Sequence, residues 1–161
     1  MRGYYKRDDQ TKEVIDQDGW FHTGDIGKLD EDGFLFITGR IKNLIVLGGG
    51  KKVFPEEVEA ALSQGSAIKE ICVMARKSAD GFKEGTEEVC AAVVPADALI
   101  AECKGDTAAI QQAVKTELDA LSENLASYKR PTRIFFFEGE FPKTATRKIK
   151  RPLVAEWLAK Q

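Results

Sequence analysis

Positive charge gathers in one stretch near the end of the printed sequence, at residues 142–152, which read PKTATRKIKRP. Its basic residues are Lys143, Arg147, Lys148, Lys150 and Arg151. The small residues at 144–146 predict a loop, which would let a neighbouring lysine reach away from the fold. Because lysine presents a compact, flexible ammonium, the stretch could contact phosphate or carboxylate groups. The alternative is a basic segment that only faces solvent.

A second group that could do chemistry is Asp25, in the stretch GWFHTGDIG at residues 19–27. An ionised carboxylate has two acceptor oxygens, enough to accept both vicinal hydroxyls of a ribose. Glycines on both sides would let a flat ligand approach the backbone. The local pattern alone is more typical of an ordinary turn aspartate. The single histidine, His22, is likewise more typical of a turn or packing residue than of a catalytic base.

The stretch GRIKN at residues 39–43 carries two further cations. Arg40 could present its planar guanidinium to hydroxyl or phosphate oxygens. Before Lys42 the sequence predicts short strands between turns, and after it strands alternate with helices. Lys42 is therefore a candidate domain boundary. Read alone, the stretch is more typical of exposed charges on a strand.

Three consecutive glycines follow in LGGGKK, at residues 47–52. Gly48, Gly49 and Gly50 predict a mobile loop that can bend sharply or admit a ligand closely. The pattern is not that of a phosphate-binding loop, because no glycine stands five residues before Gly50 and no Ser or Thr follows Lys51.

Composition excludes several function classes. The net charge is −2, and the basic stretch lacks interleaved aromatic residues, so no binding to nucleic acid is expected. The three cysteines have no metal-ligand spacing with the single histidine, so no metal site is expected, and they suit a reducing compartment. No apolar run reaches the ~18 residues of a membrane span.

The elements that must position these residues fall into two groups. The first forty residues predict an all-β segment of short strands between turns. The candidate strands are 13–15, 20–22, 26–29 and 34–38. From residue 43 strands and helices alternate, which predicts a compact α+β domain. The expected strands are 43–47, 68–77, 88–95 and 132–138, and the expected helices are 55–65, 106–126 and 152–160.

In this order the stretches resemble the closing motifs of the AMP-forming acyl-CoA synthetases, a superfamily that includes luciferases and the adenylation domains of peptide synthetases. The motifs are GYY, GWFHTGDIG, GRIKNLIVLGGGKKVFPEEVE, YKRP and PKTATRKIKR. RIKNLIVL and TATRKIKR are most similar to the long-chain fatty acid branch. The resemblance implies that residues 1–41 are the last β-strands of a large N-terminal domain. Residues 42–161 would form a small mobile C-terminal domain, with a short mixed sheet flanked by helices.

The resemblance also implies roles for individual residues. Asp25 would bind the ribose hydroxyls of ATP, Arg40 would assist there, and Lys42 would be the hinge between the domains. Lys148 would enter the active site for adenylation. The pantetheine tunnel of CoA would be lined by Gly48, Gly49 and Gly50.

Two residues depart from the pattern of this superfamily. Arg147 stands where a glycine commonly precedes the catalytic lysine, and the tunnel loop is all glycine where a serine or asparagine is frequent. The first departure bears on the flexibility of the loop around Lys148. The second bears on side-chain contacts from the tunnel loop to CoA.

The implied reaction joins a fatty acid to ATP as acyl-AMP and then transfers the acyl group to CoA. Because the phosphate loop and acyl pocket of this superfamily are missing, the chain is expected to be an inactive fragment. Its partner would be the large domain, which would also bind Mg²⁺. Unpaired strands at residues 1–40 could join a second copy of the chain. The expected location is cytoplasmic, with peripheral contact of the parent enzyme with a membrane left open.

Two other classes of function stay open at this stage. The chain could belong to another adenylate-forming enzyme, one that activates aryl, short-chain or amino acids. It could also be a free-standing binding module for CoA or a protein. A basic-tail nucleic-acid binder is the weakest alternative.

Overall fold

The computed structural model describes residues 1–78 and 86–161. Their contacts divide them into two compact units, Met1–Lys42 and Asn43–Gln161, which are described separately. Asp80 and Gly81, an Asp-Gly pair that predicts a turn between the strands expected at 68–77 and 88–95, lie outside the described residues. None of the helices in the described part of the chain has the length and apolar run that a bilayer crossing needs.

The unit Met1–Lys42 contains one helix and one hairpin. Strands β1 (Asp25–Leu29) and β2 (Leu35–Arg40) pair antiparallel, with a bulge between Ile26 and Gly27. The hairpin turn is closed by Asp30, whose carboxylate accepts the backbone N–H of Phe34 at 2.8 Å. Of the four strands predicted for this part of the sequence, those at 26–29 and 34–38 are therefore present.

Helix α1 (Asp8–Val14) corrects the expectation that the first forty residues are all-β. Its first turn carries Asp8 and Asp9, which the helix dipole favours there. Its start is also held by Thr11, whose hydroxyl donates to the carbonyl of Arg7 and accepts the N–H of Tyr4. The strands expected at 13–15 and 20–22 reduce to one antiparallel bridge, between Ile15 and Phe21.

Large apolar side chains stand exposed along the hairpin. Half or more of the side chain is exposed at Leu29, Phe34, Leu35, Phe36 and Ile37. So many large apolar side chains exposed on one hairpin are unusual for a monomeric soluble protein.

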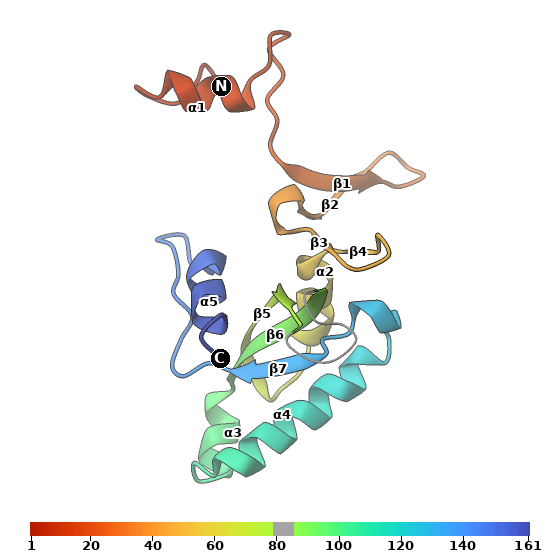
Figure 1. The fold of residues 1–161 in the computed structure, drawn as a ribbon, viewed down its shortest axis with the longest axis vertical. Coiled ribbons are helices and arrows are strands. Elements are labelled where there is room, and N and C mark those ends of the chain that lie inside the picture. Colours follow the sequence, from red (N-terminus) through yellow and green to blue (C-terminus); the bar gives the residue numbers. More distant parts are fainter. Residues whose placement is uncertain (79–85) are drawn as a thin grey trace. The chain divides into compact units, whose positions relative to one another are not determined.

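The unit Asn43–Gln161 is built on a three-stranded mixed sheet, which confirms the predicted fold class (Figure 1). Strand β5 (Ile68–Lys77) pairs antiparallel with β6 (Glu87–Pro95), and β6 pairs parallel with β7 (Arg133–Phe136). The order β5-β6-β7 makes β5 an edge strand. A separate pair of short strands, β3 (Ile45–Val46) and β4 (Lys52–Val53), precedes the sheet.

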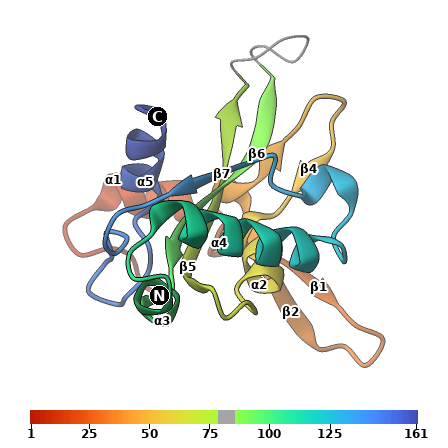
Figure 2. The ribbon, with the colours of Figure 1, turned by 90° about the horizontal axis from the view of Figure 1, so that it is seen from below.

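Helices cover both faces of this sheet, because alternate residues of β5 and β6 point to opposite sides. Helices α2 (Pro55–Leu62) and α4 (Thr107–Ser122) pack on the face that contains Val73 and Ala91. Helix α5 (Arg151–Leu158) packs on the other face, against Cys72 and Met74. Figure 2 shows the sheet from a second side, with α4 running across it.

The helix signals of the sequence agree with the observed starts of α2 and α4, although α4 ends at Ser122 and not at residue 126. Helix α2 starts with Pro55, a favoured first residue. The carboxylate of Asp106 caps α4 by accepting the N–H groups of Ala108 and Ala109. The expected strand at 43–47 is shorter than predicted, because residues 41–43 form a 3-10 turn, η1 (Ile41–Asn43). Helix α3 (Asp97–Glu102) and strand β4 were not predicted.

Candidate functional site

Asp25 and Arg40 face each other across the hairpin of the first unit. They are partners in the β1–β2 register, and the Arg40 Nε lies 2.9 Å from the Asp25 Oδ1. The Asp25 backbone N–H donates to the hydroxyl of Thr23 at 3.0 Å, which fixes the turn before the strand. The pairing leaves the carboxylate and the guanidinium side by side and partly exposed. Together they offer acceptors and donors at one point, as recognition of vicinal hydroxyls requires.

His22 belongs to a turn in this unit. Its Nε2 lies 2.8 Å from the Oδ2 of Asp16, whose other oxygen accepts the N–H of Trp20. The hydrogen bond from His22 lowers the pKa of the Asp16 carboxyl. These contacts agree with the turn role that the sequence favours for His22.

Lys42 is exposed in η1 and is the last residue of the first unit. The next residue, Asn43, donates from its side-chain Nδ2 to the Glu56 carboxylate of α2 at 2.5 Å. This hydrogen bond holds Asn43, the first residue of the second unit, to α2.

The three glycines form the turn between β3 and β4. The Gly50 N–H donates to the carbonyl of Leu47 at 3.0 Å, and the Leu47 N–H donates to the carbonyl of Lys51 at 2.9 Å. Gly49 and Gly50 have φ values of 82° and 77°, in the left-handed region that glycine tolerates best. A Cβ atom on any of the three would meet nothing within 4 Å, so the turn is open on its outer side.

Lys148 lies on a tight loop between β7 and α5. An antiparallel bridge between Lys143 and Ile149 closes the loop, and the Thr144 N–H donates to the Lys148 carbonyl at 2.8 Å. The Thr144 hydroxyl accepts the N–H of Lys148 at 3.1 Å. The Lys148 side chain is exposed, and its ammonium has no hydrogen-bond or ion-pair partner among the described residues.

The backbone of this loop explains one departure from the sequence pattern. Arg147 has a φ of 61°, in the left-handed region where glycine is normally favoured. The loop thus retains the conformation that a glycine would allow, although arginine occupies the position. The cost of this conformation for a non-glycine residue is about 1–2 kcal/mol.

The other cations of the basic stretch do not share one environment. Arg151 donates to both oxygens of Glu59 at 2.6 and 2.5 Å and to the Val73 carbonyl at 2.7 Å. Burial raises the pKa of the Glu59 carboxyl, although the Arg151 guanidinium opposes the shift. Lys143 forms an ion pair with Glu70. Neither glutamate was singled out from the sequence, since each partner lies far along the chain and no local spacing signals the pair.

The YKRP motif serves the packing of the second unit. Lys129 donates to the Glu57 carboxylate of α2 at 2.6 Å, and Arg130 donates to the carbonyls of Leu125 and Glu123 after α4. The Lys51 ammonium, next to the glycine turn, lies 4.9 Å from the centre of the Tyr128 ring. These contacts hold the end of α4 against α2 and against the turn.

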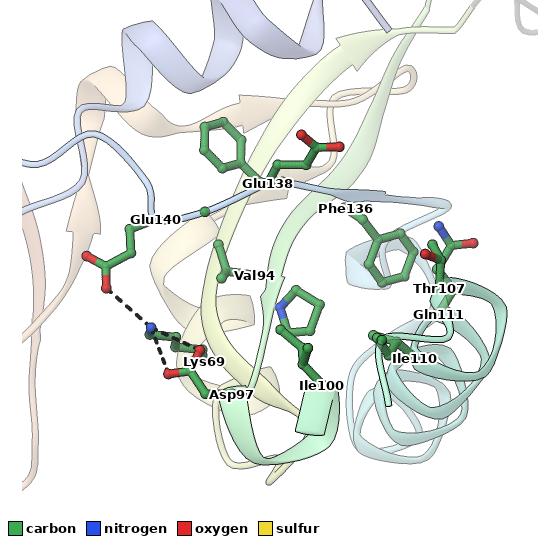
Figure 3. A pocket seen from close by; sticks show the side chains of 14 residues that line it. Lys69, Val94, Asp97, Ile100, Thr107, Ile110, Gln111, Phe136, Glu138 and Glu140 are labelled. Carbon is green, nitrogen blue, oxygen red and sulfur yellow. Dashed lines mark hydrogen bonds and ion pairs between the residues drawn. The ribbon is translucent and has the colours of Figure 1, made fainter. Parts of the chain in front are cut away.

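A cavity of about 480 Å³ lies elsewhere in this unit, between β7, α3 and the start of α4 (Figure 3). Its wall is apolar, with Val94, Ile100, Ile110 and Phe136. Lys69 lies at one end, with its Nζ 2.9 Å from Asp97 and 3.2 Å from Glu140. The hydrogen bond that Lys69 donates to Asp97, followed by that to Glu140, raises the pKa of Lys69. None of the site residues proposed from the sequence is among the described residues that line this cavity.

The predicted site residues are thus divided between the two units. Asp25, Arg40 and Lys42 belong to the first unit. Within the second, the β3–β4 turn and the loop before α5 lie on different sides of the sheet in both views (Figures 1 and 2). In the described part of the chain, no group of three or more His, Cys, Asp or Glu side chains could hold a metal ion.

Comparison with known proteins identifies the family to which this chain is similar. Residues 57–148 match the sequence profile of the AMP-binding enzyme C-terminal domain. A long-chain-fatty-acid–CoA ligase of Bacillus subtilis is 40% identical over 97% of this chain and 25% of that protein. A 2-succinylbenzoate–CoA ligase of Listeria monocytogenes is 37% identical over 94% of this chain and 28% of that protein.

A solved structure of similar fold is the A domain of a carboxylic acid reductase from Segniliparus rugosus, in complex with AMP and a co-purified carboxylic acid. It matches with a TM-score of 0.81 and 28% identity, over 99% of this chain and 25% of that one. The chain therefore spans about a quarter of the length of the proteins that it matches.

Proposed function

Because the chain belongs to the family of AMP-binding enzyme C-terminal domains, we propose that it forms the C-terminal part of an adenylate-forming acid–CoA ligase. The parent enzyme joins the carboxylate of an acid to the α-phosphate of ATP, which gives acyl-AMP and pyrophosphate. The thiol of CoA then attacks the acyl carbon and AMP leaves. The exposed ammonium of Lys148, which has no partner within residues 1–78 and 86–161, supports this proposal most directly.

Each site residue receives a role in these two steps. Asp25 accepts the ribose hydroxyls of the nucleotide, and Arg40, held beside it, donates to the same ribose. Lys148 offsets the negative charge that develops when the carboxylate meets the α-phosphate. Gly48, Gly49 and Gly50 leave space for pantetheine. Rotation about Lys42 exchanges the two faces of the small domain, which we propose comprises residues 42–161.

A fatty acid with a long chain is the proposed substrate. The similarity to a long-chain-fatty-acid–CoA ligase along nearly the whole chain favours it. A 2-succinylbenzoate–CoA ligase is similar to nearly the same degree, so an aromatic acid is the second candidate. The acyl pocket would be formed by the large domain, which is the proposed partner together with its Mg²⁺. A cytoplasmic location is proposed because the three cysteines are free thiols.

The proposed function predicts two results for one assay. The enzyme that carries this chain should form acyl-AMP and then acyl-CoA when it is given ATP, CoA and Mg²⁺ with a panel of long-chain, short-chain and aromatic acids. The separate 161-residue chain should show no ATP–pyrophosphate exchange with any of them. Exchange by the separate chain, or an enzyme inactive toward the whole panel, would overturn the proposal.

A further prediction concerns the exposed hairpin of the first unit. Its open apolar surface, with Phe34 and Leu35 more than half exposed, should drive the separate chain to associate with itself. Sedimentation velocity should show dimers or larger species that fall apart when Leu35 and Ile37 are both replaced by lysine. A monomer at all concentrations, together with slow amide exchange in β2, would contradict this expectation.

A further inference from the structure

We propose that Glu59 and Glu70 are positioning residues that hold the Lys148 loop, residues 143–149, in place for adenylation. This inference rests on the function proposed above. Neither carboxylate needs to touch a substrate. Each binds a cation at one end of the loop, Lys143 at its start or Arg151 just after its end.

Glu70, on β5, anchors the start of the loop. One carboxylate oxygen pairs with the Lys143 ammonium, and the other accepts the backbone N–H of Phe141 at 3.3 Å. Phe141 is buried and packs against the ring of Phe137 at 4.9 Å between centroids. The backbone that leads into the loop is therefore held at both a side chain and a peptide group.

Glu59, on α2, anchors the far end through Arg151. Its Oε1 accepts the N–H of Val73 at 2.6 Å, while the Arg151 guanidinium donates to the Val73 carbonyl at 2.7 Å and to Glu59 itself. Both peptide groups of Val73 lie on the free edge of β5, where a neighbouring strand would otherwise bond them. The ion pair thus takes the place of that strand and fixes the first residue of α5.

Between these anchors, the loop is held mainly by bonds of its own. Thr144 bonds the backbone of Lys148 at both its N–H and its carbonyl, but the Lys148 ammonium has no partner among the described residues. The reach of the ammonium is consequently set by where the two ends of the loop are fixed. Both ends are tied to strand β5, one at Glu70 and the other at Val73, so a shift at either end would move Lys148 as part of the loop.

The test uses charge reversal in the enzyme that carries this chain. Glu70→Lys sets two ammonium groups against each other and should slow acyl-adenylate formation by roughly 10- to 100-fold, the order of loss that a displacement of about 1 Å can cause. Conversion of supplied acyl-adenylate to acyl-CoA should change less than about twofold. The double variant Glu70→Lys/Lys143→Glu restores an ion pair and should recover most of the lost rate. Glu70→Gln keeps an acceptor for Phe141 and should give a smaller loss.

Reversal of a matched pair away from the loop is the control. Glu57→Lys faces Lys129, whose Nζ lies 2.6 Å from Glu57, and should leave acyl-adenylate formation nearly unchanged. Thermal unfolding of each variant separates misplacement of the loop from loss of the fold. Equal losses in both half-reactions, or no recovery in the double variant, would overturn the inference.

Lys148→Ala separates this inference from the proposed function. If Lys148→Ala slows adenylation and Glu70→Lys does not, the positioning role alone is wrong. If neither variant slows adenylation, the function proposed for Lys148 is wrong as well.

Discussion

Replacement of Lys148 by alanine should slow acyl-adenylate formation by roughly 10²–10³-fold, the loss that follows removal of one preorganised charge-stabilising group. The reaction brings a carboxylate to a phosphate, and the Lys148 ammonium offsets their combined negative charge. Because its side chain is exposed and unpaired among the described residues, the substitution should leave stability almost unchanged. ATP–pyrophosphate exchange measures this half-reaction directly.

Lys150→Ala is the matched control for that experiment. Lys150 carries the same charge two positions later and is also exposed. Its loss should have little effect on exchange if the position of the ammonium matters, rather than the positive charge of the segment. Equal effects of the two substitutions would show that the basic stretch acts only through its overall field.

Replacement of Lys42 by proline should instead slow thioester formation, by roughly 10²-fold, as when reacting groups are held out of place. The φ angle of proline suits a 3-10 turn such as η1, but it cannot change when the chain rotates. Asn43 is tied to Glu56, so the following backbone offers little compensating freedom. The measurement is the conversion of supplied acyl-adenylate to acyl-CoA.

A matched control for Lys42→Pro is Lys42→Ala, which removes the same charge but leaves φ free. It should retain most of the rate of thioester formation. A loss as large as that of Lys42→Pro would mean that the lysine side chain, and not backbone rotation, is what the second half-reaction needs.

The long elements of the fold follow from patterns within the sequence. Helix α4 was predicted because Ile110, Val114 and Leu118 recur at helical spacing, and all three are buried. The short elements depend on contacts that no local pattern reveals. Helix α1 buries no residue and is held at its start by the hydroxyl of Thr11, and β4 exists only as the partner of β3.

The candidate site divides in the same way. Asp25 and Arg40 were singled out from separate motifs, and the register of the hairpin pairs them. The pair of Glu59 and Arg151 joins residues 92 positions apart and gives no signal in either segment. Its existence follows from the free edge of β5, which only the sheet order reveals. Motifs thus identify residues that could meet substrates, whereas the residues that hold them in place require the fold.

Alternation of two faces of the small domain is tested most directly by one comparison of both half-reactions. Lys148→Ala and Lys42→Pro enzymes would be measured beside the unchanged enzyme, first for ATP–pyrophosphate exchange and then for acyl-CoA formation from supplied acyl-adenylate. The predicted result is opposite selectivity, with exchange lost in Lys148→Ala and thioester formation lost in Lys42→Pro. Equal damage to both steps in both variants would contradict the alternation.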